Sequence, residues 1–265
     1  MGDQEKTPKT AKYLFWLLNA MLAVAFVADL AAPQGTALDA VLIVLAAVAS
    51  VAALSAQLPL QNVLPAALIA AAFGGFAHGL TTASDIALPF GPITFNSDAG
   101  GKIFNAVPWI IPLIWVIVIF NARGVARLIL RPWRRIKNYG FWLIGLTAVL
   151  AVAFDVALEP YAWHVKHLWL WQPTKIAITW HGASPLNFLG WAFVSLLILA
   201  FATPSLIRKQ PGASGKPDFH PLFVWLGALI LFGTGSAQAG LWPAVAADAA
   251  IAAVTASFAY RGAKW

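Results

Sequence analysis

The chain contains no cysteine and few charged residues. Without thiols it can have no disulfide framework, no thiolate metal site and no cysteine nucleophile. Only 10% of its 265 residues are Asp, Glu, Lys or Arg, whereas about 25% are charged in a typical soluble domain. Hydrophobic residues make up 60% of the chain. This scarcity of charge predicts an integral membrane protein.

Long apolar segments follow one another along the whole chain. Crossing the apolar core of a bilayer takes about 20 mostly apolar residues. Eight segments meet this requirement, at roughly 13–32, 38–56, 61–83, 103–122, 139–158, 185–206, 220–237 and 241–260. The predicted fold is therefore an all-α, polytopic membrane helix bundle of about eight transmembrane helices, in a single domain over residues 1–265.

The basic residues orient these spans. With eight spans and both termini cytoplasmic, fourteen of the 17 Lys and Arg residues lie on the cytoplasmic side, as the positive-inside rule requires. The cytoplasmic loops would be 123–138 and 207–219, and the outer loops 84–102 and 159–184. The net charge of +7 is then explained by loops that meet anionic lipid headgroups. No nucleic-acid partner is predicted.

Two acids stand at the outer end of the fifth span. Asp155 and Glu159 are four residues apart, so they share one helix face, and Pro160 is expected to end the helix. Ionisable residues in membrane spans are costly and often functional, and a buried carboxyl that keeps its proton can act as a general acid. The alternative is a structural pair that bonds to the outer loop.

Asp29 and Asp248 are two of the other acids in predicted spans. Asp29, near the outer end of the first span, is expected to meet water at the interface. Asp248 lies in the last span among small residues, which favour close helix packing. It fits either a buried, hydrogen-bonded acid or, together with Asp155, the proton relay of a transporter.

The outer loop 159–184 is rich in histidine and tryptophan. His164, His167 and His181 have no carboxylate or thiolate at a spacing typical of a metal site, so no metal is predicted. Trp163, Trp169, Trp171 and Trp180 fit the aromatic belt of a membrane interface, or else the mouth of a site for a long apolar ligand.

Five short blocks occur in a recognisable order. They are PFGPITF (89–95), VPWIIPLIW (107–115), DVALEPYA (155–162), WLW (169–171) and SPLNFLGW (184–191). Over about residues 74–206 the chain resembles the bacterial and archaeal carotenoid biosynthesis membrane proteins, a family that includes hydratases of acyclic carotenoids. The family pattern has Asp where Glu159 stands. It also has a carboxylate late in the third span, where this chain has His78 and Asp85.

This resemblance implies an enzyme of the bacterial cytoplasmic membrane. It would add water across a terminal C=C bond of an acyclic carotenoid, or a related long isoprenoid, by acid catalysis and without a cofactor. Asp155 is implied as the acid, and Glu159 as its partner or as the base that orients water. Three tryptophans, Trp109, Trp115 and Trp191, would face the carbocation, and Asn187 and His78 would position water, although His78 by itself fits a structural histidine.

A second hypothesis is not enzymatic. A diverged homologue could serve as a pigment-binding or scaffold subunit of a larger membrane complex, such as a photosynthetic assembly, and the altered third span favours this hypothesis. The enzyme hypothesis expects Asp155 and Glu159 to face an elongated apolar cavity. The scaffold hypothesis expects them to pack against a neighbouring helix.

Overall fold

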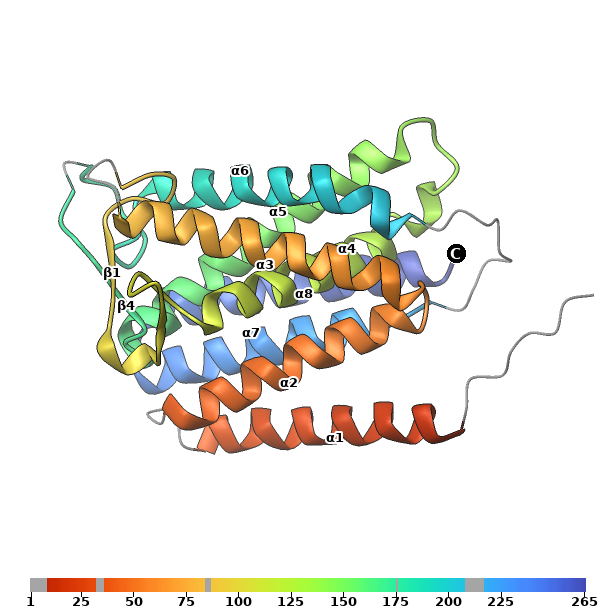
Figure 1. Cartoon of the computed structure of the whole chain (residues 1–265), viewed down its shortest axis with the longest axis horizontal. Coiled ribbons are helices and arrows are strands. Elements are labelled where there is room, and N and C mark those ends of the chain that lie inside the picture. Colours follow the sequence, from red (N-terminus) through yellow and green to blue (C-terminus); the bar gives the residue numbers. More distant parts are fainter. Residues whose placement is uncertain (1–8, 32–35, 84–86, 175, 208–216) are drawn as a thin grey trace, which may run out of the picture.

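The computed structural model describes residues 9–31, 36–83, 87–174, 176–207 and 217–265. These residues form eight α-helices that run side by side in one bundle (Figure 1). The helices are α1 (Lys9–Ala31), α2 (Thr36–Ser55), α3 (Leu60–Ala83), α4 (Ile110–Ile129), α5 (Tyr139–Pro160), α6 (Pro185–Ala202), α7 (His220–Gln238) and α8 (Trp242–Ala263).

All of these helices except α2 are long and apolar enough to cross a membrane. Helix α2 has 20 residues, which correspond to about 30 Å of helix, although its clearly apolar part is the shorter segment Asp39–Ser55. Many large apolar side chains, among them Leu14, Val24, Phe76 and Phe141, are exposed on the outside of the bundle. Exposed apolar surface of this kind suits contact with lipid. The predicted all-α membrane bundle is confirmed.

Helix α4 is the central element. It packs against α2, α3, α5, α7 and α8, and most of its residues are buried. A helix that is apolar around its whole circumference belongs in a protein core or in a membrane span, and the run IIPLIWVIVIF is apolar on every face. Helix α1, in contrast, lies at the edge of the bundle (Figure 1) and packs against α2 and α7.

The fourth span is shifted from its predicted place. It was expected at 103–122, but α4 runs from Ile110 to Ile129, so the first part of the expected cytoplasmic loop 123–138 is helical. After Arg123, the residues Ala126, Arg127 and Leu128 are good helix formers, and a continuing helix satisfies the backbone groups of this segment. Before α4, strands β2 (Lys102–Ile103) and β3 (Val107–Pro108) form a small antiparallel pair instead of helix.

The fifth span also continues beyond the predicted end. Pro160 lies inside α5, and a π-helical turn, η3 (Tyr161–Val165), follows directly. Proline has no N–H group and cannot donate to the carbonyl four residues earlier. That carbonyl belongs to Val156, and the indole Nε1 of Trp180 donates to it at 2.9 Å. The outer loop thus replaces the hydrogen bond that Pro160 cannot make, which is why the proline does not end the helix.

The two outer loops meet across one end of the bundle. Strand β1 (Ile93–Phe95) pairs antiparallel with β4 (Trp169–Trp171), and Ile93 lies opposite Trp171. These strands are at the opposite end of the bundle from the start of α1 and the end of α8 (Figure 1). The two termini of the bundle therefore lie at the same end, as the predicted topology requires.

A buried ion cluster joins α1 and α2 to the outer end of the bundle. The Nζ atom of Lys166 lies 2.6 Å from an oxygen of Asp29 and 2.6 Å from one of Asp39, and the Tyr161 hydroxyl donates to Asp29 at 2.8 Å. The prediction that Asp29 meets water is wrong, because its side chain is fully buried. Burial is tolerated because Lys166 and Tyr161 satisfy its oxygens.

Some predicted features lie outside the described residues. They include Lys6, Asp85, Lys175 and the larger part of the predicted cytoplasmic loop 207–219, of which residues 208–216 are not described.

Candidate functional site

Three polar side chains meet where α5 and α6 lie side by side. Asp155 and Glu159, one turn apart on α5, are both buried. The Nδ2 atom of Asn187 donates to Asp155 Oδ2 at 2.6 Å and to Glu159 Oε1 at 3.1 Å. Asn187 belongs to the first turn of α6, which begins with Pro185 at a position where proline is favoured. One amide therefore connects both carboxyl groups.

The outer loop provides two further donors. The indole Nε1 atoms of Trp169 and Trp171 donate to Glu159 Oε2 at 3.1 and 2.8 Å. Successive side chains of a strand alternate between its faces, so WLW places both tryptophans on the same side of β4, and both are buried. Of the two interpretations open for these tryptophans, an interfacial belt or the mouth of a site, their burial contradicts the belt.

The two carboxyl groups also differ in their partners. Glu159 accepts three N–H donors, whereas Asp155 accepts one and its Oδ1 atom has no N–H or O–H donor among the described residues. Each oxygen of Glu159 thus accepts at least one N–H donor, whereas one oxygen of Asp155 accepts none among the described residues.

Aromatic rings surround this polar cluster. The rings of Trp115 (α4) and Trp191 (α6) stack with centroids 4.2 Å apart, and His78 (α3) stacks on Phe90 at the same separation. Gly74 lies on α3 against the Trp115 ring, and a Cβ atom at this position would overlap that ring. The absence of a side chain at Gly74 thus lets the indole approach α3.

The rings and Glu159 enclose a small cavity. Its lining consists of His78, Ile93, Ile111, Ile114, Trp115, Leu158, Glu159, Trp169, Asn187 and Trp191. The open space is about 10 Å³, about the room that one water molecule needs. The lining includes Glu159 but not Asp155. Contrary to the expectation, this cavity is neither elongated nor lined by both acids, because large buried side chains fill the space around it.

Six of the seven predicted site residues are gathered here by α3, α4, α5 and α6. Trp109 is not among the residues that line the cavity, since it lies just before α4, beside Gly100, and is 37% exposed. The sequence reasoning missed the donor role of Trp169 and Trp171 and the stacking of Phe90 on His78. The alternating pattern of WLW was the one signal that could have revealed the tryptophans.

The outer-loop histidines do not belong to this cavity. The rings of His164 and His181 lie 5.5 Å apart, edge to face. Partial burial, with a contribution from His164, lowers the pKa of His181 below its ordinary value, so this histidine is neutral at pH 7. Among the residues that the structure describes, no three His, Cys, Asp or Glu side chains form a group that could hold a metal ion.

Comparison with known families explains the order of the sequence blocks. The family of carotenoid biosynthesis proteins matches residues 38–255, a wider range than the 74–206 expected from the blocks. No curated protein and no solved structure matches the chain significantly. The family match covers most of the chain and includes every residue of the cluster around Glu159, so this membrane protein belongs to the carotenoid biosynthesis protein family.

Proposed function

We propose that the protein is a hydratase of the bacterial cytoplasmic membrane that adds water to a terminal C=C bond of an acyclic carotenoid. The observation that carries this proposal is the enclosed cavity in which a carboxyl group, a water-sized space and aromatic faces occur together. Family membership supports a carotenoid or related isoprenoid as the substrate. The exposed apolar faces of the bundle suit a substrate that arrives from the bilayer.

The proposed reaction begins with proton transfer from Glu159, because Glu159 lines the cavity whereas Asp155 lies behind it. The proton goes to the less substituted alkene carbon, where a C–H bond forms as the π bond breaks. This leaves a tertiary carbocation. The indole donors of Trp169 and Trp171 and the amide of Asn187 stabilise the Glu159 anion that remains. Asp155 can then pass its own proton to Glu159.

Water completes the reaction. Its oxygen bonds to the carbocation, and the proton it releases returns to the carboxyl pair, so the net change is alkene plus water to tertiary alcohol. The faces of Trp115 and Trp191 can stabilise the cation through their π electrons. The Nδ1 atom of His78 is buried without a hydrogen-bond partner among the described residues, and His78 lines the cavity. It is therefore the proposed acceptor for the attacking water.

The cavity is closed in this structure, so the alkene end can enter only if the surrounding rings move apart. This same closure favours the second candidate function, a non-catalytic pigment-binding or scaffold subunit of a membrane complex. For that function the hydrogen bonds to Glu159 would serve only to hold α5, α6 and the outer strands together.

Expression in a host that accumulates lycopene tests the proposal. Mass spectrometry of the extracted pigments should show product that has gained one water. Glu159→Gln should lower the yield by roughly 100-fold or more, as expected for the loss of a general acid, and Asp155→Asn should lower it less. Asp248→Asn, which changes a buried carboxyl on α8 outside the site, should leave the yield near that of the parent.

Two outcomes would refute parts of this proposal. If the intact, folded protein gives no hydrated pigment, lycopene hydration is wrong, and pigment that co-purifies unchanged with the protein would support the binding subunit. If Glu159→Gln forms product as well as the parent, Glu159 is not the acid.

A further inference from the structure

A second cavity lies at the other end of the bundle, between α4, α5, α6 and the 3-10 turn η4 (Thr203–Leu206). Its volume is about 360 Å³, within the range of roughly 300–1,000 Å³ that is typical of small-molecule sites. Its lining includes six apolar side chains, those of Leu58, Leu143, Ile144, Leu199, Leu206 and Ile207. The proposed hydratase site does not use this cavity.

The cavity contains a buried cation without an anion. Arg123 is only 6% exposed, and its Nη2 atom donates to the carbonyl of Leu206 at 2.9 Å. Among the residues that the structure describes, no carboxylate forms an ion pair with Arg123. Burying a charge without a counter-charge is costly, and one carbonyl uses one of the five N–H donors of a guanidinium. Arg123 is thus prepared to bind an anion.

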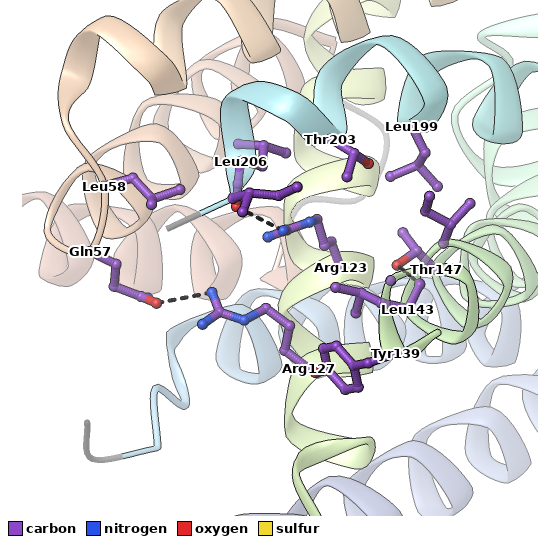
Figure 2. A pocket seen from close by; sticks show the side chains of 13 residues that line it. Gln57, Leu58, Arg123, Arg127, Tyr139, Leu143, Thr147, Leu199, Thr203 and Leu206 are labelled. Atoms are coloured by element: carbon purple, nitrogen blue, oxygen red, sulfur yellow. Dashed lines mark hydrogen bonds between the residues drawn. The ribbon is translucent and has the colours of Figure 1, made fainter. Parts of the chain in front are cut away.

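Neighbouring groups extend this donor set. Figure 2 shows the guanidinium groups of Arg123 and Arg127 on the same side of α4. Arg127 donates to Gln57 Oε1 at 3.2 Å, and Gln57 in turn donates to Asp218, so Gln57 separates Arg127 from that carboxylate. The hydroxyl of Thr203 lines the cavity and is buried without a partner in the described residues. Two guanidinium groups and an unpartnered hydroxyl therefore border the cavity, whose other polar lining residues are Gln57, Tyr139 and Thr147.

We propose that this cavity binds a phosphate group that carries an apolar chain, namely the headgroup of an anionic phospholipid of the bilayer. A planar guanidinium group can bind two oxygens of one phosphate at the same time. The leucine and isoleucine side chains of the lining suit contact with the first methylene groups of the lipid chains. The cavity lies at the end of the bundle that holds the predicted cytoplasmic loops. Lys and Arg side chains at such ends meet anionic headgroups.

Native mass spectrometry of the delipidated protein in detergent tests this proposal. The probes are phosphatidylglycerol, diacylglycerol with the same chains, and inorganic phosphate. One phosphatidylglycerol should bind, and Arg123→Gln should weaken its binding at least tenfold. Arg135→Gln, which removes an exposed arginine at the same end outside the cavity lining, should bind as tightly as the parent. Diacylglycerol and inorganic phosphate should each bind the parent at least tenfold more weakly than phosphatidylglycerol does.

Each other outcome overturns the proposal. Equal binding by Arg123→Gln and the parent would exclude Arg123 as the phosphate contact. Equal binding of diacylglycerol would show that the cavity recognises only apolar chains, and equal binding of inorganic phosphate would show that no lipid is needed. If Arg123→Gln does not fold, the Ile144→Trp variant tests the site instead. This substitution keeps both arginines, and its larger side chain fills the cavity from a partly exposed position. Unchanged phosphatidylglycerol binding in this variant would refute the site.

Discussion

Single side chains determine which chemistry the carboxyl cluster can perform. Asp155 and Glu159 are both acids on one face of α5, yet their surroundings differ, because three N–H donors reach Glu159 and one reaches Asp155. The spacing of the two acids was visible in the sequence and predicted their common face. It could not predict which acid meets the cavity, because Trp169, Trp171 and Asn187 come from other elements.

One glycine at this scale gives a direct test of the packing. At Gly74→Ala the new Cβ atom would overlap the Trp115 ring, which is fully buried and has little room to move. We expect a loss of about 1–3 kcal/mol in stability, as for other overpacked sites, measured by unfolding in mixed micelles. The matched control is Gly145→Ala on α5, where nothing lies within 4 Å of the added Cβ. An equal loss in both variants would contradict the proposed contact.

At the scale of elements, the outer loop 159–184 supplies hydrogen-bond donors to groups on helix α5. Strand β4 brings its tryptophans to Glu159, and Trp180 donates to the Val156 carbonyl that Pro160 leaves without its helical donor. The sequence predicted a helix end at Pro160 because the local effect of proline is to break the helix. The helix continues because Trp180, 24 positions after Val156, donates the hydrogen bond to the Val156 carbonyl.

This explanation predicts a coupling between Trp180 and Pro160. Trp180→Phe should cost about 1–3 kcal/mol, since it leaves a partly buried carbonyl without a donor. The same change in a Pro160→Ala background should cost less, because alanine has the N–H group that proline lacks. A double-mutant cycle on unfolding free energies measures the difference. Additive effects of the two substitutions would show that the Trp180 bond does not compensate for the proline.

At the scale of the whole molecule, an even number of helices places the two termini at the same end of the bundle. The start of α1, the segment after α4 and the end of α8 lie together, opposite the paired strands (Figure 1). The excess of basic residues in these three segments predicts that the end of the bundle with both termini faces the cytoplasm.

The absence of cysteine makes this orientation easy to test, because an introduced thiol is the only one in the chain. In cells, Gly101→Cys should react with a membrane-impermeant maleimide, since Gly101 is exposed at the end with the strands. Lys137→Cys, at the opposite end, should react only after the membrane is permeabilised. The reverse labelling pattern would invert the predicted topology.

The sequence by itself determined the membrane bundle, the approximate spans, the shared face of Asp155 and Glu159, and the resemblance that the family match confirms. These properties depend on apolar length, helical period and short ordered blocks, which are local. Only the tertiary structure decided that Asp29 pairs with Lys166, that two loop tryptophans bind Glu159, and that Arg123 is buried beside a cavity. Those contacts join residues 10 to 137 positions apart. They arise when helices and loops pack to satisfy polar groups that lipid cannot hydrate.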